Sequence, residues 1–190
     1  MLGQTELFVP EPTAKLRDRV TVALITTAQA RHTLETFHYL HRTRSGPQLN
    51  YAVTIDGIVD GVITYAYPMM SAPLLGVPSD ELLEFARLYL HQNLPHSASC
   101  AIGKTIRRVQ AEWQRKHPEA KPPRLVVSWS DSTRHLGTVY KAANFTWIKR
   151  SSHRGVGRYR GPGKYRTKYA DFKNEKDCWV FWFDPKARRG

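Results

Sequence analysis

Cysteines and long apolar runs are both scarce in this sequence. The two cysteines, Cys100 and Cys178, are too few for a disulfide framework and are consistent with a reducing compartment. The longest apolar runs, at 20–25 and 57–66, are interrupted by Thr, Asp or Gly and fall short of the roughly 20 residues that span a bilayer. The first residues lack the basic start and apolar stretch of a secretory signal. We therefore expect a cytoplasmic protein without a membrane helix.

Acidic residues are also scarce relative to basic ones. The chain has 16 Asp and Glu against 29 Lys and Arg, a formal charge of +13. From Lys149 to the end there are 13 basic and 4 acidic residues, a net of +9, which leaves +4 for everything before. So large a positive field indicates a polyanionic partner. A solvated basic tail or a ribosome-associated segment is the alternative.

The length of 190 residues suits one hydrophobic core, so we expect a single domain with appendages. Strands alternate with helices in the second half, which predicts an α/β layered domain. We expect a central, mixed, twisted sheet flanked by helices over residues 1–150. A basic, aromatic-rich extension over 151–190 then packs on or next to this core.

Local patterns place most of the elements. The dipeptide Asp56-Gly57 supplies the positive φ angles of a tight turn, which predicts a hairpin of strands 50–55 and 58–65. Apolar residues three or four apart predict a helix over 98–116 with one buried face. Similar patterns predict helices at 27–39 and 135–144, and strands at 20–27, 84–90, 124–129, 145–149 and 177–183.

A segment rich in Gly, Arg and Tyr lies near the end of the chain, from 151 to 166. Such a segment buries little apolar surface and is either a mobile arm or a loop shaped against its ligand. Its cations suit phosphates and its tyrosines suit stacking on bases, whereas a solvated basic loop is the alternative for any one residue. The expected DNA-binding residues are Lys149, Arg150, Arg154, Arg158, Tyr159, Arg160, Lys164, Tyr165, Arg166 and Lys168.

Two consecutive stretches, 126–131 and 135–145, resemble the closing half of a GNAT-type N-acyltransferase. In that superfamily a strand leads to a helix with a Gly-x-x-Tyr-like pattern, here Gly137 to Tyr140, and a Gly-Phe pair leads into the next strand. Asn144-Phe145 stands where Gly-Phe is usual, a departure that Asn tolerates because it adopts left-handed geometry. The resemblance implies a GNAT-like fold, and it implies that Tyr140 lies near the thioester of a bound acyl-CoA.

A closer resemblance is to the Mom family of phage DNA-modification proteins. It rests on the order and spacing of the stretches 37–39, 84–88, 99–103, 128–131 and 137–145 together. The resemblance implies conversion of adenine N6 in DNA to its N6-carbamoylmethyl derivative, which protects phage DNA from host restriction. Acetyl-CoA and iron are its implied participants.

Four residues are the expected catalytic set: His38, Tyr39, Asp131 and Tyr140. Asp131 ends a predicted buried strand, where ligand sites of α/β sheets gather, although Ser130-Asp131-Ser132 is also good helix-cap chemistry. Tyr140 is either a general acid toward the thiolate or a core tyrosine with a satisfied hydroxyl. Imidazole and carboxylate suit a mononuclear iron, so His38, Tyr39 and Asp131 are also the expected metal ligands.

The cofactor path is expected to include Arg87, Ser99, Gly103 and Lys104. GNAT enzymes hold the CoA pyrophosphate at a helix N-terminus, and the helix predicted from about Ser99 is the corresponding one. Small residues occur there, but the Gly-rich signature of the superfamily is absent. Without the resemblance, Arg87 is a strand-edge charge and Ser99 a helix cap. His41 lies three residues after His38, so both could share a helix face.

Two other function classes stay open. The chain is alternatively an acetyltransferase for a protein or small amine, with the basic tail serving localisation. It is alternatively a non-catalytic DNA-binding, anti-restriction protein, for which replacing Asp131 or Tyr140 leaves activity intact.

Overall fold

The computed structural model describes residues 14–68, 74–92, 94–151 and 175–186. Over this part of the chain a seven-stranded sheet has the order β1-β2-β3-β4-β5-β7-β6. The strands are β1 (Val20–Ile25), β2 (Gln48–Ile55), β3 (Ile58–Ala66), β4 (Leu82–Leu90), β5 (Leu125–Asp131), β6 (Thr146–Ser151) and β7 (Lys176–Trp182). The helices are α1 (Leu16–Arg19), α2 (Thr27–Phe37), the short 3-10 turn η1 (Ser79–Glu81), α3 (Ser97–Lys116) and α4 (Thr138–Ala142).

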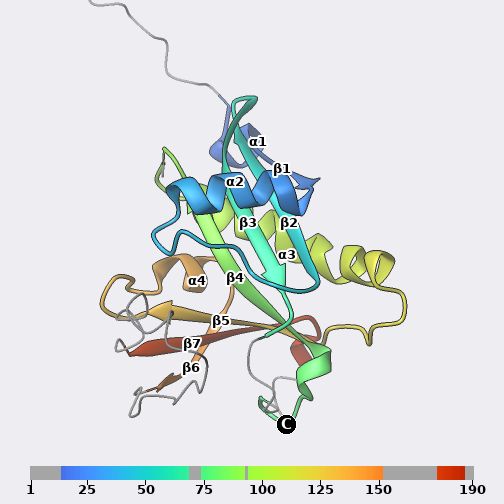
Figure 1. Cartoon of the computed structure of the whole chain (residues 1–190). Helices are drawn as coiled ribbons and strands as arrows, with labels where there is room; N and C mark the ends of the chain where they lie inside the picture. Colours follow the sequence, from blue (N-terminus) through green and yellow to red (C-terminus); the bar gives the residue numbers. More distant parts are fainter. Residues whose placement is uncertain (1–13, 69–73, 93, 152–174, 187–190) are drawn as a thin grey trace, which may run out of the picture.

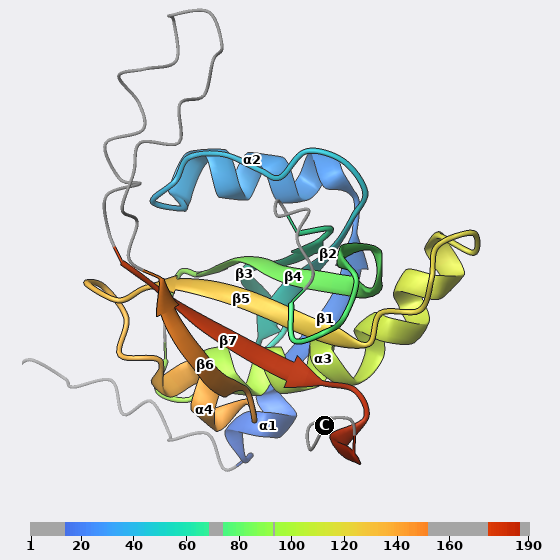
Figure 2. The same cartoon turned by 90° about the horizontal axis from the view of Figure 1, so that it is seen from below.

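Helices cover both faces of the sheet, which confirms the predicted mixed α/β architecture. Helix α2 lies on one face, and α1, α3 and α4 lie on the other (Figures 1 and 2). The pair β4 and β5 is parallel, and the remaining neighbours in the described sheet are antiparallel. The larger core cluster joins α3 to this sheet, whereas a smaller cluster lies under α2.

Local sequence chemistry accounts for the best-predicted elements. Asp56 and Gly57 both have positive φ, 52° and 81°, as the tight turn between β2 and β3 requires. Asn144 has a φ of 63°, which confirms its left-handed role before β6. In α3 the predicted stripe is buried and packs on the sheet: Ile102, Ile106, Val109 and Trp113.

Two helices are shorter than predicted, and both differences shape the site. Helix α2 ends at Phe37 because His38 adopts extended backbone angles, so His38 and His41 do not share a helix face. Helix α4 begins only at Thr138, after Gly137 with a φ of 73°. Residues 135–137 therefore belong to the loop after β5 and not to the start of the predicted helix. No helix in the described ranges is long and apolar enough to cross a membrane.

Candidate active site

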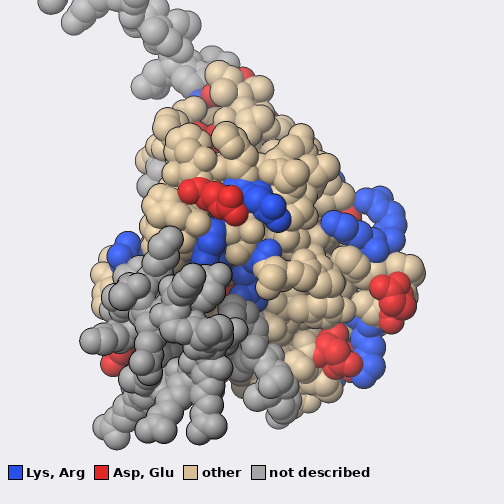
Figure 3. All heavy atoms as spheres, viewed as in Figure 1, with Lys and Arg blue, Asp and Glu red and all other residues tan. Residues whose placement is uncertain are grey.

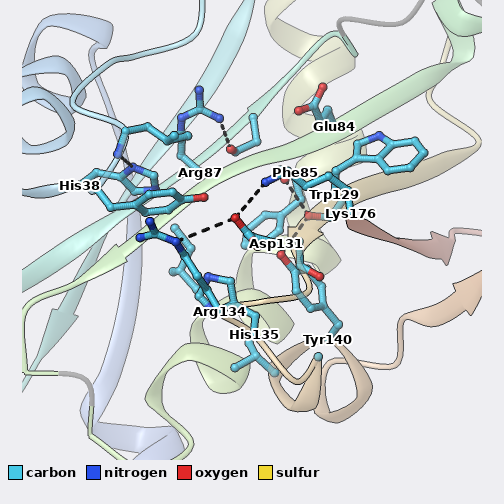
Figure 4. Close-up of a pocket in the computed structure, with 18 of the residues that line it drawn as sticks. His38, Glu84, Phe85, Arg87, Trp129, Asp131, Arg134, His135, Tyr140 and Lys176 are labelled. Atoms are coloured by element: carbon cyan, nitrogen blue, oxygen red, sulfur yellow. Dashed lines mark hydrogen bonds and ion pairs between the residues drawn. The ribbon is translucent and has the colours of Figure 1, made fainter. Parts of the chain in front are cut away.

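The parallel strands β4 and β5 separate along their length, and a cavity opens between them. Their pairing covers only Leu82 to Glu84 against Leu125 to Val127. A register shift between β3 and β4 leaves Ala86 as an extra residue, which forms a bulge at the point of separation. The cavity has a volume of about 1000 Å³ and is lined by residues of both strands and of the loops after α2 and β5 (Figure 4).

The cavity carries an excess of positive charge. Five cationic residues line it against two acidic ones, a net of +3. In the space-filling view, Lys and Arg side chains gather on this face of the molecule below α2 (Figure 3). A concave surface with this balance attracts an anionic ligand. The charged residues of the cavity are Arg42, Arg44, Glu84, Arg87, Asp131, Arg134 and Lys176.

Asp131 ends β5 and is only 2% exposed. Its Oδ1 accepts hydrogen bonds from the backbone N–H of Thr133 at 3.1 Å and from the Thr133 hydroxyl at 2.6 Å. Its Oδ2 lies 3.2 Å from Lys176 Nζ and 3.9 Å from Arg134 Nε (Figure 4). One oxygen of Asp131 thus holds the following turn, which is not the first turn of a helix because α4 begins at Thr138, and the other oxygen meets two cations of the cavity.

His38 and Tyr39 line the same cavity from the loop after α2. The imidazole Nδ1 of His38 accepts the N–H of Leu40 at 3.1 Å, which leaves the ring proton on Nε2. Burial, followed by the charge of Arg87, lowers the pKa of His38 to about 4, so the ring is neutral at pH 7. The His38 and Tyr39 rings stack at 4.6 Å, and the Arg134 guanidinium lies over Tyr39 at 5.0 Å.

Tyr140 combines a packed ring with a hydroxyl inside the cavity. The ring stacks on Trp179 with centroids 5.3 Å apart, and its oxygen lies 3.1 Å from Ser128 Oγ. Burial raises the pKa of Tyr140 to about 12, so the phenol keeps its proton at neutral pH. Ser128 also donates a hydrogen bond to the Phe85 carbonyl at 3.0 Å, which ties the hydroxyl pair to β4.

Arg87 lines the cavity beside two other guanidinium groups. Its Nε donates to the carbonyl of Arg42 at 3.4 Å. Burial, with the charges of Arg44 and Arg42, lowers the pKa of Arg87 to about 10. Arg44 forms a 2.9 Å ion pair with Glu84, in which the two side chains are only 7% and 13% exposed. Cations held this close together favour a bound anion.

Ser99, Gly103 and Lys104, which the resemblance groups with Arg87, line a second cavity of about 570 Å³. It lies between α1, α3 and the end of α4. Its cations Arg17, Lys104 and Arg107 outnumber its one acid, Asp18, and suit the phosphates of a nucleotide-containing cofactor. Ser99 Oγ donates to the His96 carbonyl at 3.0 Å, so its hydroxyl is occupied within the first turn. The structure thus divides the expected cofactor residues between two cavities.

The residues expected to hold iron do not fit a metal. A His38 bound to a metal through Nε2 carries its proton on Nδ1, but Nδ1 faces the N–H of Leu40. Both oxygens of Asp131 are engaged, and Arg134 and Lys176 would repel a cation there. Within the described ranges, no group of three or more His, Cys, Asp or Glu residues is arranged to hold a metal ion. No chemical step below involves iron.

Most of the predicted DNA-binding residues, from Arg154 to Lys168, lie outside the described residues. Lys149 and Arg150 are on β6 and do not line the cavity. Arg150 donates to Asp177 at 2.9 Å and lies 3.5 Å from Glu175, so two acids partly neutralise it.

Several residues of the cavity were not expected from the sequence. Glu84 carried a usable signal, because an acid within an apolar strand needs a partner. Arg134 lies three residues after Asp131, just before the predicted helix 135–144, and nothing in the sequence indicated that it faces the cavity. Lys176 carried no signal, since it reaches the cavity only because β7 pairs with β5 and sets Lys176 opposite Asp131.

Solved structures share this fold at low sequence identity. YncA of Salmonella typhimurium, solved with its cofactor acetyl-CoA, has a TM-score of 0.53 and 14% identity over 88% of this chain and 95% of that one. An N-acetyltransferase from Staphylococcus aureus Mu50 has a TM-score of 0.53 and 10% identity over 87% and 99%. The chain spans 66% of a Salmonella typhimurium acetyltransferase that modifies the N-terminal serine of ribosomal protein L7/L12. That match covers 73% of this chain, with a TM-score of 0.45 and 11% identity. The fold is that of GNAT acetyltransferases.

Sequence comparison identifies the family. No curated protein matches the sequence. The model of the Mom protein family matches residues 19–177, which include the whole of β1 to β6 and every residue that lines the larger cavity. The chain therefore belongs to the Mom protein family.

Proposed function

We propose that this protein modifies the N6 amino group of adenine in double-stranded DNA, with an acyl-CoA as co-substrate. The product is the N6-carbamoylmethyl derivative implied by the family, and it protects phage DNA in the host cytoplasm from restriction. The observation that carries the proposal is the cationic cavity between β4 and β5. It gathers His38, Tyr39, Asp131 and Tyr140 from three separate parts of the chain.

The acceptor has to leave the duplex before it reacts, because its amino group is paired and enclosed by the base stack. Tyr39 contacts the extruded adenine with the part of its side chain that His38 and Arg134 leave exposed. Its ring is 42% exposed, and His38 and Arg134 hold it in place. The neutral His38 presents a donor Nε2–H, which suits a ring nitrogen of the base.

Asp131 accepts a proton from the acceptor amine, and Tyr140 donates a proton to the leaving group. N6 exchanges one N–H bond for a bond to carbon, and Asp131 Oδ2, beside Lys176, accepts the proton that N6 releases. Acyl transfer alone would give N6-acyladenine, so the carbamoyl nitrogen of the proposed product comes from an additional amine donor. Tyr140 keeps its phenolic proton at neutral pH and donates it to the departing sulfur. When bound, an acyl-CoA would supply an activated thioester. Arg17, Lys104 and Arg107 would hold its phosphates, since these cations line the second cavity.

The duplex lies against the basic segment between β6 and β7. Residues 152–174 contain seven Lys or Arg and one Asp. The described ends of this segment adjoin the cavity, since Ser151 Oγ donates to the carbonyl of Lys176, which itself contacts Asp131. We infer that the residues predicted to bind DNA contact phosphates on both sides of the extruded base.

Nucleoside mass spectrometry of DNA from cells that express the protein tests the proposal. The wild type is expected to give modified adenine, and Asp131→Asn to lower the yield by about 100-fold or more because the proton acceptor is lost. Asp80→Asn is the matched control, because Asp80 is exposed and pairs with Lys121 away from both cavities.

An unmodified adenine pool from soluble, folded wild-type protein contradicts the proposal. In that case, acetyl transfer to a peptide amine in vitro supports the protein acetyltransferase alternative instead.

A further inference from the structure

The loop between β5 and α4 presents an apolar side chain at the rim of the cavity. Leu136 is 88% exposed, more than the other exposed large hydrophobic residues of the described chain, the next of which is Val59 at 67%. Leu136 also lines the cavity that holds Asp131. An exposed leucine alone is ordinary, but one fixed at the mouth of a polar, cationic site needs a reason.

The loop is held in one shape by its own backbone. The N–H groups of Arg134 and His135 donate to the carbonyl of Asp131 at 3.1 and 2.9 Å. At its other end, Gly137 has a φ of 73° and is packed so closely on Trp179 that a Cβ would lie 2.0 Å from the ring. Leu136 therefore stands on a firmly built turn whose two ends are anchored.

The neighbours of Leu136 indicate the chemistry of what it meets. Arg134 precedes it by two residues, and Arg134, His135 and Lys176 all line the cavity that Leu136 lines (Figure 4). An apolar side chain two residues from a guanidinium, at a cavity with a net charge of +3, does not match an apolar protein groove. It does match duplex DNA, which offers phosphates on the outside and a stack of apolar base faces between them. Proteins that unstack DNA insert such apolar wedges between base steps.

We propose that Leu136 enters the base stack and fills the space that the extruded adenine leaves. This inference rests on the proposed function and adds the means by which the base is held out of the duplex. Leu136 lies five residues after Asp131, and both line the same cavity, so the wedge and the proton acceptor act at one site. Leu136 is a positioning residue and takes no part in the bond changes.

Two readouts test the wedge directly. The first is the ratio of adenine modification in duplex DNA to that in single-stranded DNA of the same sequence, measured by nucleoside mass spectrometry. The second is the fluorescence of 2-aminopurine placed at an adenine position in the duplex, which rises when the base leaves the stack. We compare the wild type with Leu136→Ala, the conservative Leu136→Met, and the exposed aliphatic control Ile58→Ala in the β2–β3 hairpin.

Leu136→Ala is expected to lower the duplex to single-strand ratio about tenfold, since holding a base out of the stack costs a few kcal/mol and single strands need no opening. The 2-aminopurine signal is expected to fall with it. Leu136→Met is expected to restore both, and Ile58→Ala to match the wild type.

An unchanged ratio and an unchanged 2-aminopurine signal in Leu136→Ala overturn the inference and leave the proposed function intact. An equal loss on duplex and single-stranded DNA also overturns it, because Leu136 then shapes the cavity and does not open the duplex. If the wild type modifies neither substrate, the proposed function itself fails.

Discussion

His38 has an environment that only its neutral form tolerates. It is 5% exposed, its Nδ1 is occupied by a backbone donor, and the cation Arg87 lies nearby. Protonation of the ring in the folded protein would lose the Leu40 hydrogen bond and place a buried charge beside other cations. The same features that make His38 a poor metal ligand make it a fixed hydrogen-bond donor toward the cavity.

The pKa of about 4 predicts a pH dependence of stability. The unfolded chain, with an ordinary histidine pKa near 6.5, binds a proton that the folded protein does not. The free energy of unfolding is therefore expected to fall as pH drops from about 6.5 to 4, by roughly 3 kcal/mol for this group. Urea unfolding at steps of pH measures this.

The control for that measurement is a comparison between variants, because carboxylates titrate in the same range. His38→Gln is expected to remove this part of the slope, whereas His32→Gln, on the exposed face of α2, is expected to keep it. Equal slopes in the wild type and in His38→Gln contradict the assignment.

The helices and strands divide into those that local sequence determines and those that it does not. The β2–β3 hairpin follows from Asp56-Gly57, and α3 follows from its apolar period, so both were predicted within two residues. The separation of β4 from β5 and the insertion of β7 between β5 and β6 depend on long-range pairing. For this reason the sequence indicated Asp131 but not Lys176, which contacts it.

The loop after α2 is tied to β4 by a buried ion pair. Arg44 donates to the Tyr67 carbonyl and to Glu84, both at 2.9 Å. These bonds fix the loop that carries His38 and Tyr39 beside the point where β4 separates from β5. Charges this poorly solvated are held in place by one another. The shape of the cavity therefore depends on both the loop after α2 and strand β4.

Replacing one partner of the Arg44–Glu84 ion pair is expected to lower the free energy of unfolding more than replacing both partners. Arg44→Met and Glu84→Leu each leave one buried charge without its partner, so each is expected to destabilise the protein by about 3–5 kcal/mol. The double variant is expected to be more stable than the sum of the single effects predicts, as urea unfolding of all four proteins measures. Additive effects would show that the two side chains act independently.

Charge is distributed unevenly over the whole chain, and under the proposed function this unevenness determines how the protein binds DNA. The formal charge is +13, and residues 152–174 contribute seven basic residues against one acid. On the described surface, several cations are already neutralised by acids, such as Lys121 by Asp80 and Arg19 by Asp56. The excess of basic over acidic residues is therefore largest in the sequence near the end of the chain, and the cavity lining carries a net charge of +3.

This distribution predicts a steep and selective salt dependence of DNA binding. Each phosphate contact contributes about −0.9 to the slope of log K against log salt concentration, because it releases condensed counterions. Replacing Arg158 and Arg160 together by alanine is expected to reduce the slope by about 1.8 and to weaken binding to all sequences alike. Fluorescence anisotropy with a duplex at several salt concentrations measures both.

Lys121→Ala is the control and is expected to keep the wild-type slope, since its charge is already paired. If the double variant also keeps that slope, the basic segment does not contact the phosphate backbone, and the cations of the cavity alone attract the DNA.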